Sequence, residues 1–331
     1  MTLTPRRGRS AIATAPEVTL SPFLDPATRP LDPGKFRDPH VTAKGERRAS
    51  VALRRIETLW INTGTLCNLA CKTCYIESSP TNDALVYLSL AEAEAYFDEA
   101  KALGTREIGF TGGEPFMNRD MVPMMRAALE RGFDVLVLTN AMRPMRRFEE
   151  ALKALVLEHR DRLTMRVSLD HYSPAVHEAE RGVGTWAKAL DGLKWLSDHG
   201  FRLAVAGRTL GRESEEAARS GYARLFDELG VRVDAGLVLF PEMDAAADVA
   251  EITEACWGIL DVSPSAMMCA SSRMVVKAKG AARPHVVACT LLPHDPQFAL
   301  GETLAAAGGG VSLNHPHCAR FCVLGGASCS G

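Results

Sequence analysis

From Thr58 onward the sequence repeats one pattern, a short apolar run rich in β-branched residues followed by a longer segment with helical periodicity. The pattern occurs six times, and such alternation is typical of parallel strands connected by helices. The predicted strands are 58–62, 107–111, 134–139, 163–169, 202–206 and 232–239. Six units are too few to close an eight-stranded barrel. We therefore predict an α/β fold, a partial (β/α)6 TIM-like barrel whose functional loops follow the strands.

A predicted helix follows each predicted strand. The first has the clearest ends, because Ser89 and Glu92 can form a capping box and Gly104 suits the left-handed position after a helix. Glycines also close several of the later helices. The predicted helices are 89–104, 120–131, 147–159, 185–199, 213–229 and about 245–260.

The segments on either side of this barrel have a different character. Residues 1–55 carry prolines spaced too closely for regular structure, which predicts an extended Pro-rich N-terminal arm. After residue 262, the segments 271–276 and 284–288 flank a glycine-containing turn and predict a β-hairpin. We expect three parts, the arm at 1–55, the barrel at 56–262 and a small cysteine-rich C-terminal extension at 263–331.

Three cysteines, Cys67, Cys71 and Cys74, follow the first predicted strand within eight residues. Thiolates are soft ligands that suit iron–sulfur clusters or zinc. A structural zinc site is expected to complete four ligands, whereas no fourth cysteine lies near this loop. Three thiolates can hold three corners of a cubane and leave one iron open for a ligand. The missing fourth ligand therefore favours a cofactor-binding cluster.

A second motif, Thr111-Gly112-Gly113-Glu114-Pro115, ends the second predicted strand. A CxxxCxxC loop with a following aromatic, here Tyr75, together with this GGEP motif, resembles the radical S-adenosylmethionine (radical SAM) superfamily. The likeness covers about residues 58–239. Residues 180–186 also resemble an RGxGTF-type stretch of its peptide-maturase and molybdopterin-precursor cyclase branches.

The resemblance implies a catalytic chemistry. Cys67, Cys71 and Cys74 would hold a 4Fe-4S cluster whose open iron chelates the methionine amine and carboxylate of S-adenosylmethionine. A reductant such as flavodoxin or ferredoxin would supply the electron that cleaves the cofactor to a 5′-deoxyadenosyl radical, which abstracts hydrogen from substrate. The expected cofactor-binding residues all follow strands: Tyr75, Gly112, Gly113, Glu114, Pro115, Asn140, Ser168, Asp170 and Arg208. At Asp170 a ribose contact is favoured over proton transfer.

Five further cysteines lie near the C-terminus: Cys269, Cys289, Cys318, Cys322 and Cys329. The first two bracket the predicted hairpin. Together the five resemble the SPASM or twitch extensions that bind an auxiliary 4Fe-4S cluster, with fewer cysteines than the full SPASM pattern, so a single twitch-like cluster is expected. Which four ligate it stays open. The alternatives are zinc, with His315 or His317 as a ligand, or a mixture of disulfide and idle thiols.

The charge and hydropathy of the chain limit the kinds of partner that it is expected to bind. A formal net charge of -2 and the absence of a long basic run argue against nucleic acid. No apolar stretch suits a membrane span or a secretory signal, so we expect a cytoplasmic protein. Nine cysteines, an odd number, in a reducing compartment favour metal ligands over disulfides.

The expected function is a radical SAM oxidoreductase or maturase acting on a peptide or a small molecule. Peptide maturases of this superfamily often carry an N-terminal leader-binding domain, and the arm is too short and irregular to form one. This favours a small molecule, or a peptide recruited by another protein. The alternative is a non-catalytic iron–sulfur or zinc protein that senses or scaffolds. The GGEP motif argues against it, because a sensor does not need a methionine-binding edge.

Overall fold

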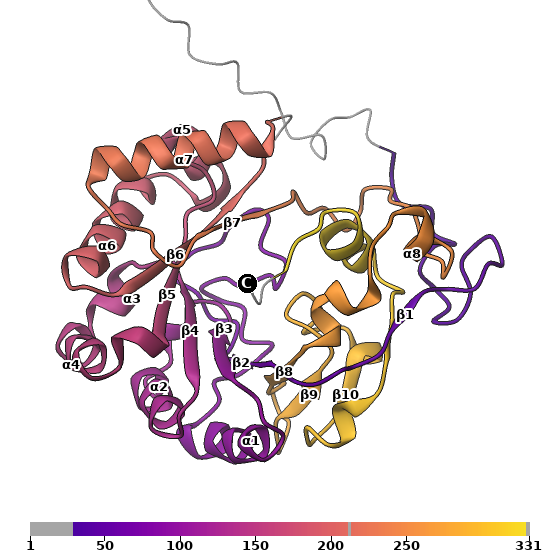
Figure 1. Ribbon diagram of the computed structural model, residues 1–331, viewed down its shortest axis with the longest axis horizontal. Helices are drawn as coiled ribbons and strands as arrows, with labels where there is room; N and C mark the ends of the chain where they lie inside the picture. The colour runs from indigo at the N-terminus through magenta and orange to yellow at the C-terminus, as the bar shows by residue number, and fades with distance from the viewer. Residues whose placement is uncertain (1–28, 211–212, 329–331) are drawn as a thin grey trace, which may run out of the picture.

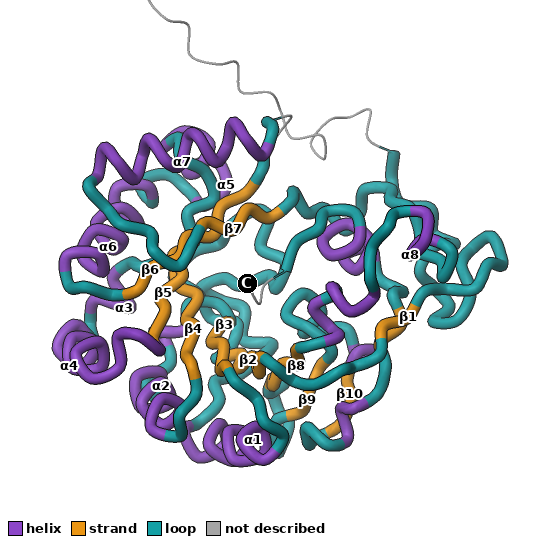
Figure 2. Tube along the Cα trace, in the orientation of Figure 1, coloured by secondary structure: helices purple, strands orange, loops and turns teal. Residues whose placement is uncertain are grey.

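The computed structural model describes residues 29–210 and 213–328. Its centre is a curved sheet with helices on the outer face and a C-terminal unit beside it (Figure 1). Within the described residues this sheet has nine strands in the order β10-β9-β8-β2-β3-β4-β5-β6-β7. Strands β2 to β7 pair in parallel in sequence order. The predicted partial (β/α)6 barrel is therefore confirmed, and Figure 2 shows its strands as one continuous band.

The bounds of the barrel elements follow the sequence pattern closely. The strands are β2 (Thr58–Asn62), β3 (Glu107–Thr111), β4 (Asp134–Thr139), β5 (Leu163–Ser168), β6 (Arg202–Arg208) and β7 (Leu237–Phe240). The helices are α1 (Leu90–Ala102), α2 (Met121–Glu130), α3 (Arg143–Arg146), α4 (Glu149–His159), α5 (Pro174–Arg181), α6 (Trp186–Asp198) and α7 (Glu215–Leu229). The capping box of α1 is present, with Ser89 and Glu92 bonded to each other's backbone.

Two barrel predictions were wrong. The predicted helix at 245–260 is mostly loop, and only α8 (Cys256–Ile259) is helical there. The loop pairs with the N-terminal arm instead, through bridges Pro30↔Ala247 and Arg48↔Thr253. The predicted strand at 232–239 begins later, at Leu237, because residues 232–236 form a turn whose Gly236 has a φ of 94°.

The C-terminal unit adds strands to the same sheet, which the sequence pattern did not predict. Its elements are β8 (Ser272–Val276), β9 (His285–Val287), β10 (Ala299–Gly301), β11 (Val311–Ser312) and a π-helix at Cys318–Val323. The predicted hairpin is confirmed, since β8 and β9 are antiparallel. Strand β8 also pairs in parallel with β2, and in the arm β1 (Ser50–Val51) pairs with β11.

Successive residues of a strand point to opposite faces of the sheet, so they pack into two separate cores. Leu59 and Ile61 of β2 pack with the helices on the outer face. Trp60, between them, belongs to a second core with the C-terminal unit. No helix in the described part of the chain is long and apolar enough to cross a membrane.

Candidate active site

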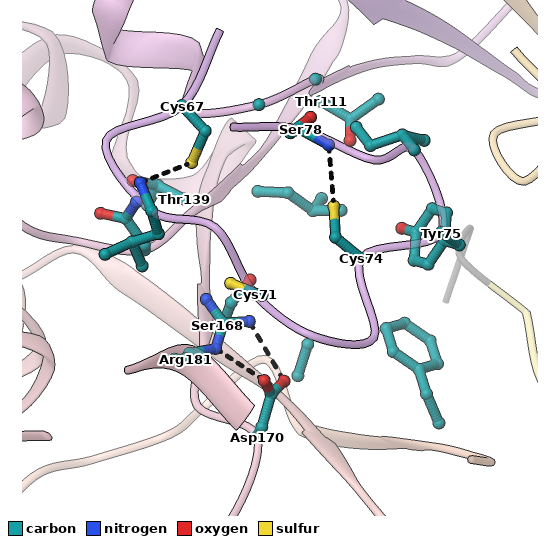
Figure 3. A pocket seen from close by; sticks show the side chains of 18 of the residues that line it. Cys67, Cys71, Cys74, Tyr75, Ser78, Thr111, Thr139, Ser168, Asp170 and Arg181 are labelled. Carbon is teal, nitrogen blue, oxygen red and sulfur yellow. Dashed lines mark hydrogen bonds and ion pairs between the residues drawn. The ribbon is translucent and has the colours of Figure 1, made fainter. Parts of the chain in front are cut away.

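One cavity lies where the carboxyl ends of the barrel strands meet the cysteine loop (Figure 3). Parallel strands bring their carboxyl ends to the same edge, so residues far apart in sequence converge there. The residues lining the cavity are Cys67, Leu69, Cys71, Cys74, Tyr75, Ile76, Ser78, Thr111, Gly112, Gly113, Leu138, Thr139, Asn140, Ser168, Asp170, Arg181, Ala206, Arg208 and Phe240. All three predicted cluster cysteines are therefore brought together.

Backbone hydrogen bonds tie the start of the cysteine loop to the segment that follows it. The N–H of Thr65 donates to the carbonyl of Leu85 at 3.0 Å, and the N–H of Cys67 donates to the carbonyl of Ser79 at 3.0 Å. The thiols also accept hydrogen bonds from the loop's own backbone, Cys67 Sγ at 3.4 Å and Cys74 Sγ at 3.3 Å. These bonds present the thiols to one cavity.

The chemistry of this donor set fits a cluster with an open metal. Burial raises the pKa of Cys67 to about 12 and also raises the pKa of Cys71. The thiols must therefore lose protons when they bind a metal, and the metal's charge must drive that loss. Among the lining residues no fourth cysteine or histidine occurs. No group of three His, Cys, Asp or Glu side chains in the described chain is arranged around a single metal ion.

The two glycines after β3 allow the strand end and the cysteine loop to approach closely. The N–H of Gly113 donates to the carbonyl of Gly64 at 2.8 Å. A Cβ on Gly113 would lie 2.1 Å from the carbonyl oxygen of Leu66, and one on Gly112, whose φ is 138°, would lie 2.6 Å from that of Gly64. A side chain at either position would displace the cysteine loop.

Glu114 and Pro115, expected among the cofactor-binding residues, do not line this cavity. The carboxylate of Glu114 is buried, and it accepts hydrogen bonds from the hydroxyl of Thr139 and the N–H of Asn140, each at 2.8 Å. Burial raises the pKa of Glu114 to about 7, although these hydrogen bonds act to lower it. Its side chain thus ties the end of β3 to the end of β4.

Asp170 lies at the cavity in a buried ion network. Its carboxylate accepts from Arg181 at 2.8 and 3.1 Å and from Arg208 at 3.2 Å. Burial alone would raise the pKa of Asp170, but the two guanidinium groups hold it well below its usual value. Asp170 therefore stays ionised, and Figure 3 shows its contacts with Arg181. Arg208, expected among the cofactor-binding residues, is thus paired with the carboxylate of Asp170.

Arg181 was not among the predicted site residues, although residues 180–186 had been noted as a family-like stretch. Its neighbour Glu180 holds the cysteine loop, since the hydroxyl of Thr73 donates to the Glu180 carboxylate at 2.8 Å. The N–H of Lys72 also donates to the carbonyl of Glu180 at 2.9 Å. The end of α5 therefore anchors both the ion network and the loop.

The remaining predicted residues, Tyr75, Asn140 and Ser168, all line the cavity. The amide of Asn140 donates to the side-chain oxygen of Asn68 at 2.9 Å, which adds a further tie between β4 and the cysteine loop. The sequence did not single out the apolar lining residues, such as Phe240, because a buried apolar residue gives no separate signal of a site.

A second cavity collects four of the C-terminal cysteines. Its lining residues are Met267, Met268, Cys269, Cys289, Leu291, Leu292, Val311, Leu313, His317, Cys318 and Cys322. Burial raises the pKa of Cys269 to about 11 and that of Cys318 to about 12. Every cysteine that the structure describes is a free thiol. Cys329 lies outside the described residues, and Cys256 lines neither cavity.

Comparison with known proteins supports one family. Residues 61–219 match the Radical SAM superfamily. The bacteriocin subtilosin biosynthesis protein AlbA of Bacillus subtilis is 32% identical over 141 residues, 42% of this chain and 30% of AlbA. An AdoMet-dependent heme synthase of Nitratidesulfovibrio vulgaris is 27% identical over 171 residues, 50% of this chain and 44% of the synthase. The chain thus spans less than half the length of these relatives.

Solved structures share the fold. SuiB of Streptococcus suis bound to S-adenosylmethionine has a TM-score of 0.56 at 13% identity, covering 75% of this chain and 63% of SuiB. AnSMEcpe with bound AdoMet has a TM-score of 0.54 at 15% identity, covering 76% and 79% of the two chains. The resemblance drawn from the cysteine and GGEP motifs is confirmed, and residues 61–219 form a domain of the radical SAM superfamily.

Proposed function

We propose that this protein is a radical SAM enzyme whose cluster is held by Cys67, Cys71 and Cys74 and whose substrate is a peptide or a small molecule. The observation that carries the proposal is the convergence of these thiols, the Gly112–Gly113 backbone and the Asp170 ion network on one cavity. When bound and reduced, the cluster and S-adenosylmethionine supply a one-electron cleavage of a carbon–sulfur bond, giving methionine and a 5′-deoxyadenosyl radical that abstracts hydrogen.

The chain's own residues bind and orient the cofactor. The backbone at Gly112 and Gly113 lines the cavity where the methionine end is expected, while Asn140 and Ser168 offer polar groups at neighbouring strand ends. Asp170 is held ionised between two arginines, so it acts as a fixed charge and not as the proton-transfer group. The surrounding apolar residues exclude water from the reactive radical.

We further propose that the second cavity holds an auxiliary 4Fe-4S cluster. Cys269, Cys289, Cys318 and Cys322 supply four thiols, which is the usual complement for such a cluster. Full ligation would leave no iron open for substrate, which favours electron transfer as its role. Zinc is the competing occupant of the same thiols.

The relatives support both substrate classes. AlbA is named for the biosynthesis of a bacteriocin, and a further SuiB structure contains the precursor peptide SuiA. The AdoMet-dependent heme synthase is named for a small molecule. We propose that the enzyme acts in the cytoplasm, where its many thiols stay reduced and a flavodoxin or ferredoxin supplies the electron.

The test is anaerobic reconstitution with iron and sulfide, followed by addition of dithionite and S-adenosylmethionine. The proposal expects release of 5′-deoxyadenosine and a change in the spectrum of the reduced cluster on adding the cofactor. A fully loaded cluster that yields no 5′-deoxyadenosine and does not respond to the cofactor would favour the non-catalytic sensor.

A further inference from the structure

A surface groove runs beside the cysteine loop, separate from the cavity described above. It is lined by the loop and short helix after β4, by the start of α6, and by Asn68 and Leu69 of the cysteine loop. Helices α3 and α6 lie on the outer side of the barrel in Figure 1, and a 3.3 Å ion pair between Arg146 and Asp191 connects them.

The groove is positively charged. Arg143, Arg147 and Lys188 line it, and all three are exposed. Its two carboxylates, Glu149 and Asp191, both pair with Arg146. The four cations and two carboxylates leave a net charge of two positive units, on a chain whose formal net charge is -2. A local charge of this sign attracts an acidic partner and speeds its association.

The groove also lies next to the predicted cluster site. Asn68 and Leu69 fall between Cys67 and Cys71 in the sequence, and Leu69 lines both the groove and the cysteine cavity. The N–H of Leu69 donates to Cys67 Sγ at 3.4 Å. A protein seated in the groove would therefore be separated from the cysteine cavity only by the loop itself.

The walls of the groove are preformed. Ala141 has a φ of 58°, and α6 packs so closely against it that a Cβ on Gly192 would lie 1.8 Å from the Ala141 carbonyl oxygen. The guanidinium of Arg146 lies 4.9 Å from the centre of the Trp195 ring. A rigid, charged surface needs little reorganisation when a partner binds.

We propose that this groove is the docking site for an acidic one-electron carrier protein, which reduces the cluster across the 68–69 segment. The proposal rests on the proposed function and names the partner of that same site. The groove's charge, its shared wall with the cysteine cavity and its rigidity each support a protein that delivers electrons without entering the cavity.

The test compares two reductants on the full-length reconstituted protein. The variant is R143E/R147E/K188E, and its matched control is K44E/R54E/R232E, which reverses three exposed cations that do not line the groove. With a reduced flavodoxin as donor at low salt, the groove variant should release 5′-deoxyadenosine roughly tenfold more slowly than the wild type and the control. Added salt should slow the wild type and have little effect on the groove variant. With dithionite, all three proteins should react at the same rate.

Each other outcome has a clear meaning. Equal flavodoxin-driven rates in the groove variant and the control would overturn the docking site. An equal loss with dithionite and with flavodoxin would also overturn it, because the groove residues would then support the cavity. Binding of a substrate peptide to the groove, with electron delivery unchanged, would assign the groove to substrate. A wild type that cleaves no S-adenosylmethionine even with dithionite would instead refute the proposed function.

Discussion

Strands β2 to β7 and strands β8 to β10 belong to one sheet, yet different interactions hold them in place. The barrel strands pair in parallel and carry alternating residues that pack under a layer of helices. The C-terminal strands are short, and their core includes cysteine side chains and a buried arginine. The core under the barrel helices consists of apolar and aromatic side chains, whereas the core beside the C-terminal unit also contains cysteine thiols and is joined by the hydrogen bonds of a buried arginine.

Arg273 shows the second kind of stabilisation. Its side chain is fully buried, and its guanidinium donates to the carbonyl oxygens of Ala307 at 2.9 Å, Cys269 at 2.6 Å and Gly309 at 2.8 Å. One side chain thereby joins the start of β8 to a loop some 35 residues away, as the spacings of 34 and 36 residues in these bonds show. A small unit with few apolar layers needs such connections.

Arg48 connects the N-terminal arm to the rest of the chain in a similar way. It is buried and pairs with Glu251 at 2.5 Å, and it also donates to backbone carbonyls of the arm. The loop around Glu251 is the segment for which a helix had been predicted. The carboxylate of Glu251 pairs with Arg48 of the arm. This contact between distant segments therefore outweighs the helical pattern of the local sequence.

The largest effects are expected when one cysteine is removed from the barrel or from the C-terminal unit. Cys71→Ala should abolish S-adenosylmethionine cleavage, because two thiolates cannot hold the proposed catalytic cluster. Cys322→Ala should lower the iron content and leave part of the cleavage, because its thiol lines the other cavity. Iron analysis and 5′-deoxyadenosine release measure both effects.

The matched control for both variants is Cys256→Ala, since Cys256 lines neither cavity. If Cys322→Ala contained as much iron as the wild type, the proposal of an auxiliary cluster would be refuted. Zinc recovered from that cavity would identify zinc as its occupant. Retained cleavage in Cys71→Ala would refute the ligand set of the first cavity.

The barrel could be predicted because its signals are local. Strands 58–62, 107–111 and 134–139 match the observed bounds, since β-branched runs and glycine-ended helices report on nearby residues alone. The three cysteines and the glycine motif likewise lie in short loops directly after strands. Their convergence follows from parallel topology without further information.

The rest of the site depends on contacts between distant residues. Gly113 was expected among the cofactor-binding residues, but a Cβ there would meet the Leu66 carbonyl of the cysteine loop. Asp170 was expected to contact a ribose, and its arginine partners come from 11 and 38 residues away. Pairing of β8 with β2 spans more than 200 residues. Periodicity and motif spacing carry no information on these distances.

A second test weakens only the C-terminal unit. Arg273→Met keeps much of the buried volume but leaves several carbonyl oxygens without their donor. Each such buried group costs about 1–3 kcal/mol, so the free energy of unfolding should fall by at least ~3 kcal/mol. Chemical denaturation followed by circular dichroism measures the loss, and the exposed Arg54→Met is the control. A loss no greater than that of Arg54→Met would show that the carbonyls find other partners.

The smallest effect is a pH dependence that belongs to the barrel. His177 of α5 is fully buried against Trp186, and burial lowers its pKa from 6.5 to about 4. Between pH 6.5 and pH 4 the unfolded chain therefore binds a proton at His177 that the folded chain does not bind. The contribution of neutral, buried His177 to the free energy of unfolding is complete above pH 6.5 and is lost as the pH falls toward 4. The loss amounts to at most about 3 kcal/mol. In His177→Phe, which keeps the aromatic contact, unfolding free energies measured at pH 7 and pH 5 should differ less than in the wild type. If the two proteins lost the same stability over that range, the acid sensitivity would reside in groups other than His177.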